Sequence, residues 1–94
     1  MNCFNVDDIV EVVGYKNSNS SKNFLGVVGR VSYVHDDYGI ARYAIEFDTK
    51  IHLSHSCRAG GVDRVPSGKG QWLVAEDLRL IQSDIPNLDM SSLL

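Results

Sequence analysis

Two neighbouring stretches of sequence decide the fold. The first is Phe24-Leu25-Gly26-Val27-Val28-Gly29-Arg30-Val31-Ser32-Tyr33-Val34, and the second is Tyr43-Ala44-Ile45-Glu46-Phe47-Asp48. Apolar, mostly β-branched or aromatic residues dominate both, and the second alternates large apolar residues with polar or small ones. The turn-forming residues Asp36-Asp37-Tyr38-Gly39 lie between them. The pattern predicts a bent β-hairpin with strands over residues 25–35 and 40–48.

Two glycines in the first of these strands predict its curvature. A strand interior usually holds glycine where the chain bulges or bends, and Gly26 and Gly29 are three residues apart. No helix start follows them, so they are not a phosphate-binding loop. We expect the bend to bring one set of apolar residues into a common core: Val28, Val31, Tyr43, Ile45 and Phe47. Arg42, Ala44, Glu46 and Asp48 are expected on the opposite face.

Weaker patterns on either side complete an all-β chain. Residues 8–14, 71–75 and 79–81 predict three further short strands, with Val10 and Val12 pointing inward and a 3₁₀ turn at 76–78. Residues 15–23 predict a polar surface loop, and residues 49–70 a long, irregular, glycine-rich insertion between the third and fourth strands. We expect one small five-stranded β-barrel over residues 1–82 and a tail over residues 83–94. The tail's aliphatic residues are compatible with fraying, folding back, pairing with a second copy or docking in a partner.

Composition narrows the function classes. The 94 residues allow one domain, with 44% hydrophobic and 22% charged residues. A net charge of −3 and a pI near 5.4 argue against a domain whose main task is to neutralise many phosphates. No apolar run approaches the roughly 18 residues of a membrane-spanning helix, so no membrane partner is expected. The N-terminal residues lack a secretory signal, and we expect a cytoplasmic protein with Cys3 and Cys57 reduced.

Four motifs resemble SH3-like barrels of the KOW type. Asp8-Ile9-Val10-Glu11-Val12 resembles their opening strand, although Asp7 replaces the usual preceding glycine. Gly26-x-x-Gly29-x-Val31 resembles their glycine pair, and Tyr43-x-Ile45-x-Phe47-Asp48 their third strand. Trp72-x-Val74 followed by Glu76-Asp77-Leu78 is similar to their closing segment. The resemblance spans about residues 8–81 and implies an SH3-like barrel.

The insertion carries a further resemblance. His55-x-Cys57-x-x-Gly60, followed by Gly68-x-Gly70-x-Trp72, resembles small SH3-like proteins encoded by bacteriophages and prophages. This resemblance implies a phage or mobile-element origin, with the host cytoplasm as the site of action. It implies no particular activity.

The same segment holds candidate ligands and a candidate nucleophile. His52, His55 and Cys57 are residue types that bind zinc, but a structural zinc site needs a fourth ligand, such as His35 or Cys3. A thiol beside a histidine also has the composition of a nucleophile pair, yet nothing around Cys57 indicates an oxyanion hole. We therefore expect no metal, cofactor or catalysis. Cys57 is expected as a small buried residue and the histidines as partners of the backbone.

Candidate binding residues occur in three places. The acidic turn presents Asp36, Asp37 and Tyr38. Arg58 and Arg64, with Lys69, Arg42 and Arg30 nearby, are candidates for a phosphate-contacting edge. Trp72 fits either a ligand-binding aromatic or a residue that covers one mouth of the barrel, and we favour the second interpretation.

The resulting expectation is a non-catalytic module that engages a host protein through Asp36, Asp37, Tyr38, Arg58, Arg64 and Trp72. An acidic surface suits a basic, nucleic-acid-facing groove on the target, so inhibition of a host enzyme or defence complex is the leading hypothesis. The alternative is a KOW-like module that binds RNA or a ribosomal partner. The sequence leaves the oligomeric state open.

Overall fold

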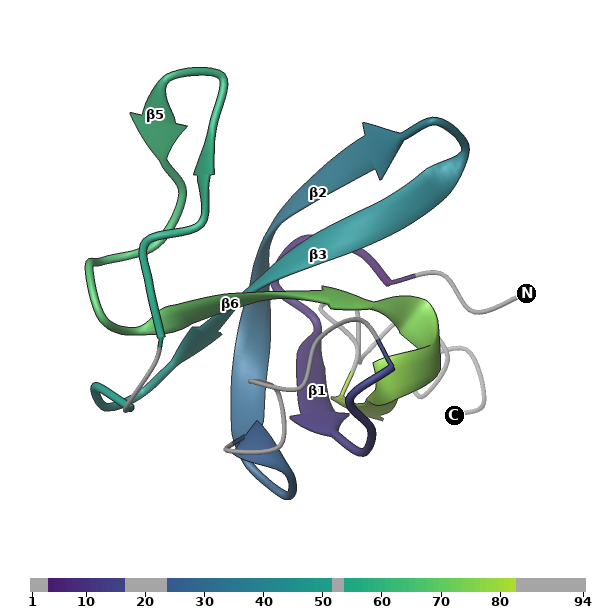
Figure 1. Cartoon of the computed structure of the whole chain (residues 1–94). Helices are drawn as coiled ribbons and strands as arrows, with labels where there is room; N and C mark the ends of the chain where they lie inside the picture. Colours follow the sequence, from purple (N-terminus) through teal and green to yellow (C-terminus); the bar gives the residue numbers. More distant parts are fainter. Residues whose placement is uncertain (1–3, 17–23, 52–53, 83–94) are drawn as a thin grey trace, which may run out of the picture.

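The computed structural model describes residues 4–16, 24–51 and 54–82 (Figure 1). These residues form mostly antiparallel strands, and they also include a single-turn 3₁₀ helix, η2. In chain order the elements are β1 (Ile9–Val12), β2 (Val28–Asp37), β3 (Ile40–Phe47), β4 (Arg58–Ala59), β5 (Val62–Asp63), β6 (Gly70–Val74), η2 (Ala75–Asp77) and β7 (Leu78–Gln82). The all-β prediction is confirmed.

Five of the strands form one sheet in the order β6-β3-β2-β1-β7. Each neighbouring pair in this order is antiparallel. In the part of the chain that the structure describes, β6 and β7 lie at the two ends of this order, and η2 connects them along the chain. The 3₁₀ turn predicted at residues 76–78 is present, and it begins one residue earlier, at Ala75. The predicted tail, residues 83–94, lies outside the described residues.

The hairpin between β2 and β3 is longer than the sequence predicts. Asp36 and Asp37 belong to β2 and pair with Ala41 and Ile40, so their assignment to the turn was wrong. The turn is Tyr38-Gly39, and both residues have positive φ angles, 53° and 87°. A two-residue connection of this geometry continues the right-handed twist of the strands. It extends the hairpin as an arm beyond the rest of the sheet (Figure 1).

The main core lies against one face of the sheet. Ten buried residues form it: Phe4, Val10, Val12, Phe24, Val31, Tyr43, Ile45, Phe47, Leu73 and Leu78. The predicted inward positions of Val10 and Val12 are confirmed. Val28 is 46% exposed, so its predicted place in the core was wrong. It lies opposite Glu11 in β1, on the outward face of the sheet.

The two glycines of the bend have different roles. Gly26 precedes β2 in a turn and has a φ of 83°, so it is not inside a strand as predicted. Gly29 is inside β2, where a Cβ atom would lie 2.6 Å from Ile45 Cγ2 and 2.7 Å from the Glu46 carbonyl oxygen. Gly29 therefore allows β2 to pack closely on β3.

A β-bulge in β2 reverses which residues face the main core. Val31 pairs with Ile45, whereas Tyr33 pairs with Ala44, so Ser32 is the extra residue. One extra residue moves every later side chain to the opposite face of the sheet. Val31 therefore points into the main core, and Tyr33 and the residues that alternate with it point to the other side.

The insertion is not wholly irregular. It contains the short hairpin β4–β5, with Arg58 opposite Asp63 and Ala59 opposite Val62. His55 and Gly70 exchange two backbone hydrogen bonds of 2.7 Å, which attach the insertion to the start of β6. The hairpin projects from the sheet beside the β2–β3 arm (Figure 1).

Candidate functional site

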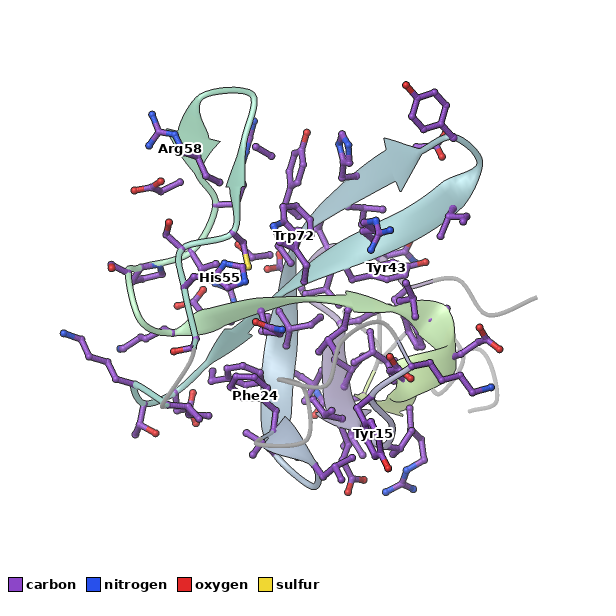
Figure 2. The ribbon with its side chains drawn as sticks, in the orientation of Figure 1. Tyr15, Phe24, Tyr43, His55, Arg58 and Trp72 are labelled. Atoms are coloured by element: carbon purple, nitrogen blue, oxygen red, sulfur yellow. The ribbon has the colours of Figure 1, made fainter. Side chains whose placement is uncertain are left out.

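A groove lies between these two hairpins. It has a volume of about 500 Å³ and is lined by His35 from β2, Arg42 from β3, Trp72 from β6, and Arg58, Ala59 and Gly60 from the insertion. Figure 2 shows Trp72 at the centre of the molecule, with Arg58 on the projecting hairpin at its side. The groove is therefore assembled from three parts of the chain, which are the β2–β3 hairpin, the insertion and β6.

Strand register determines its floor. Tyr33, Ala44 and Trp72 lie opposite one another across β2, β3 and β6, and His35, Arg42 and Val74 form the next row. Residues directly opposite one another on antiparallel strands share a face. The bulge at Ser32 is the reason that Tyr33 and His35 belong to this face rather than to the main core.

Aromatic contacts hold the indole in place. The ring of Trp72 meets that of Tyr33 at 6.3 Å and that of His35 at 6.2 Å, in both cases edge to face. Such arrangements are favourable because the positive edge of one ring faces the negative face of the other. The side chain of Trp72 is partly buried by these neighbours, and it also lines the groove. Trp72 thus combines a packing role with a surface role.

A small second core lies under the insertion. Ala44, Cys57 and Val65 are buried there, with Tyr33 and Trp72 packed against them. Gly70 makes the close approach possible, because a Cβ atom at this position would lie 2.3 Å from Val65 Cγ2 and 2.9 Å from Cys57 Sγ. This cluster positions the β4–β5 hairpin as one wall of the groove.

Arg64 braces the same wall. Its guanidinium carbon lies 4.0 Å from the centre of the Tyr33 ring, and its Nε donates a hydrogen bond of 3.1 Å to the Ala59 carbonyl oxygen. The hydroxyl of the bulged Ser32 donates a hydrogen bond of 2.6 Å to the Arg64 carbonyl oxygen. The structure therefore places Arg64 behind the groove, as a link between the insertion and the sheet.

Charge in the groove is locally positive. Arg42 and Arg58 line it together with His35, and none of the described lining residues is a carboxylate. Arg58 forms an exposed ion pair of 3.0 Å with Asp63, which also accepts a hydrogen bond of 3.2 Å from the Ser56 hydroxyl. The single Oδ1 atom of Asp63 engages only part of the Arg58 guanidinium, because a guanidinium has five N–H donors.

A second hollow, of about 320 Å³, differs in its charge pattern. Arg30 and Lys69 line it, but so do Glu46 and Asp48. Arg30 forms ion pairs with Asp7 and Glu46, and these carboxylates raise its pKa. Four of the five cations expected to form one phosphate-contacting edge are thus divided between two hollows, and Arg64 lines neither. The charges of the second hollow are largely balanced.

The tip of the β2–β3 arm is the remaining predicted site. Tyr38 is fully exposed and lies in the left-handed region of φ, which favours glycine or asparagine. Asp36 Oδ1 accepts a hydrogen bond of 3.0 Å from the Gly39 N–H, so this carboxylate stabilises the turn. The backbone thus holds a large aromatic side chain in solvent at a position whose φ favours glycine or asparagine.

His55 and Cys57 both make contacts within the fold. Cys57 is a free, fully buried thiol, and burial raises its pKa to about 12. Its backbone N–H donates a hydrogen bond of 3.0 Å to Nδ1 of His55, as expected for a histidine that partners the backbone. His52 and Cys3 lie outside the described residues. Within residues 4–16, 24–51 and 54–82, no group of three or more His, Cys, Asp or Glu side chains is arranged to hold a metal ion.

The structure thus separates the six predicted binding residues. Arg58 and Trp72 line the groove, Arg64 supports it, and Asp36, Asp37 and Tyr38 lie at the end of the neighbouring arm. Sequence reasoning missed His35 as a groove residue and did not associate Arg42 with Trp72. The bulge at Ser32 is the missing signal, since strict alternation from Val31 directs His35 into the main core.

No protein-family model, curated protein or solved structure matches this chain. Among the described residues, none of the helical segments has the length and apolar character needed to cross a membrane.

Proposed function

We propose that this protein is a non-catalytic binding module that engages another protein through the groove and the tip of the β2–β3 arm. The observation that carries the proposal is the groove itself, in which an indole lies between two projecting hairpins. Aromatic side chains and arginines are the residues that most often dominate protein interfaces. The exposed Tyr38 adds a second anchor, because local strain combined with full exposure favours a contact role over a stabilising one.

We further propose that the sheet closes as an SH3-like barrel and that the partner is a host protein of a phage or other mobile element. The strand order and the 3₁₀ turn before the last strand support the barrel. The net charge of −3 and the two aspartates at the end of β2 support a target with a basic surface, such as a nucleic-acid-handling or defence complex.

Affinity capture from a nuclease-treated bacterial lysate tests this function. The wild type should retain a protein that Trp72→Ala and Tyr38→Ala lose, whereas the control Arg79→Ala should retain it. Arg79 is a suitable control because it is exposed and paired with Glu11 on β1, outside the groove. Circular dichroism should show the same strand content for all four proteins. Retention of no protein, or equal retention by every variant, contradicts the proposed function.

Reversing the charge of the arm tests the basic target. Asp36→Lys combined with Asp37→Lys should weaken binding to the captured protein, because attraction becomes repulsion. Unchanged affinity would remove this end of the arm from the binding surface.

A KOW-like RNA-binding module is the second candidate. The observation that favours it is the proximity of Arg42, Arg58 and His35 to an indole on which a base can stack. It predicts an RNA gel shift at low salt that weakens steeply as salt is added. A shift that is absent at low salt contradicts it.

A further inference from the structure

We propose that the groove binds an acidic segment of the partner protein, with carboxylates on Arg42 and Arg58 and an apolar side chain on Trp72. This inference rests on the proposed function and specifies the chemistry of its ligand. It is independent of the charge of the arm, because the groove and the end of the arm carry opposite charges.

The first argument is the contrast between the groove and its surroundings. The whole chain is acidic, yet the groove is lined by two arginines and a histidine, and none of its described lining residues is acidic. The other hollow also has two cations, but two carboxylates line it with them. The cationic character is therefore a local property of the groove and is complementary to a negatively charged ligand.

The second argument is geometric. Guanidinium groups present donors in a planar fork that matches the two oxygens of a carboxylate. Arg42 projects from the sheet and Arg58 from the facing hairpin, so they approach a bound segment from two elements. In the same groove Trp72 offers an aromatic surface, and Ala59 and Gly60 add to the lining without charge or bulk.

Size and charge favour a peptide over a nucleic acid. A volume of about 500 Å³ accommodates a few side chains. Nucleic-acid affinity depends on the neutralisation of many phosphates along the backbone. Here the nearby carboxylate of Asp63 would repel a continuous polyanion outside the groove. Isolated carboxylates that alternate with apolar side chains avoid this repulsion.

Trp72 supplies a direct readout because it is the only tryptophan in the chain. Its fluorescence is followed during titration with a short peptide of alternating glutamate and leucine. Matched peptides carry glutamine or lysine in place of glutamate, and a short oligouridylate is titrated in parallel. The glutamate peptide should bind about tenfold more tightly than the glutamine peptide, and the lysine peptide should bind most weakly.

Two arginine variants identify the surface. Arg58 and Arg79 have closely matched side-chain exposures, 65% and 64%, and each forms an ion pair with one carboxylate, Asp63 or Glu11. Only Arg58 lines the groove. Arg58→Ala should weaken binding of the glutamate peptide about tenfold, and Arg79→Ala should change it less than about twofold.

Asp63→Asn provides a change of opposite sign. Asparagine preserves an acceptor for Ser56 and removes the negative charge that competes for Arg58. Binding of the glutamate peptide should strengthen about threefold, which is within the range for the loss of an exposed ion pair. Equal binding of the three peptides, tighter binding of oligouridylate, or equal effects of Arg58→Ala and Arg79→Ala would overturn the acidic-segment proposal. A failed peptide titration beside a captured protein that Trp72→Ala loses would overturn this inference and leave the proposed function standing.

Discussion

The two buried regions of this molecule differ in size and purpose. The main core contains ten buried residues contributed by all five strands of the sheet and by flanking segments. The second core contains three, Ala44, Cys57 and Val65, and joins the insertion to the opposite face of the same sheet. Buried apolar area is the dominant source of stability. The main core should therefore set the free energy of unfolding of the whole domain, while the second core sets the position of the groove wall.

This difference implies that stability and binding are separable. A sheet that is held together from one face can lose the packing of a hairpin on its other face without global unfolding. The hairpin in turn orients Arg58 beside Trp72, so its displacement removes one wall of the groove. Substitutions in the two cores should have distinct signatures.

The largest expected effect comes from the main core. Phe47 is 1% exposed and stacks on Phe24 with a distance of 5.1 Å between the ring centres. Phe47→Ala should reduce the free energy of unfolding by about 3–5 kcal/mol, because it leaves a large cavity. Urea denaturation followed by circular dichroism measures this. A loss below about 1 kcal/mol would contradict the central role of the main core.

A matched pair of glycine substitutions compares the regions directly. Gly29→Ala introduces a methyl group against Ile45 and Glu46 of β3, and Gly70→Ala introduces one against Val65 and Cys57. Overpacking of this kind costs about 1–3 kcal/mol. Gly29→Ala should lower protection from hydrogen exchange throughout the sheet. Gly70→Ala should lower it mainly at the amides of His55, Arg64 and Val65, which bond within the insertion or to Gly70.

The same pair of variants distinguishes their effects on binding. Gly70→Ala should weaken binding of the glutamate peptide even under conditions in which the sheet remains folded. Equal exchange profiles for the two variants would show that the two cores unfold as one unit.

High pH should act on the second core. The pKa of Cys57 is raised from 9.0 to about 12 by burial, so the folded state keeps a proton that the unfolded state loses in this range. The free energy of unfolding should fall by about 1.4 kcal/mol for each pH unit between these values. Below pH 9 both states hold the proton and the effect vanishes. The Cys57→Ala variant has no thiol, so its free energy of unfolding lacks this decrease. The variant should therefore become more stable relative to the wild type as the pH rises above 9.

The smallest expected effect is at the tip of the arm. Tyr38→Asn places a residue that tolerates a positive φ at a position with φ of 53°. It should stabilise the protein by about 1 kcal/mol in thermal or urea unfolding. The same variant should lose affinity for a protein partner if the ring is an anchor. A destabilised variant would indicate that the exposed ring makes a stabilising contact in the free protein.

Much of the fold could be predicted from local patterns. The alternation in residues 43–48 indicated β3 and its buried face, and the β-branched run at residues 9–12 indicated β1. The end of β2 was not predictable in this way, because Asp36 and Asp37 are typical turn residues that here continue the strand. Their strand conformation depends on pairing with β3, and no local propensity encodes that pairing.

The site was predictable only in part. Trp72 and Arg58 are conspicuous residue types in a glycine-rich context, and both line the groove. His35 was not predictable as their neighbour, because its side depends on the extra residue at Ser32. The buried position of Ala44 likewise depends on Cys57 and Val65, which reach it from the insertion.

The sequence by itself determined the five strands of the main sheet, the inward residues of β1 and β3 and the glycine that β2 needs at position 29, because alternation and steric exclusion act over a few residues. Only the tertiary structure decided that β2 changes face at Ser32, that the insertion forms a hairpin over the second face, and that Arg42, Arg58, His35 and Trp72 meet in one groove. The physical reason is that a bulge and a long-range contact are chosen by the total packing of both faces. A change of one residue in register reverses every side chain that follows.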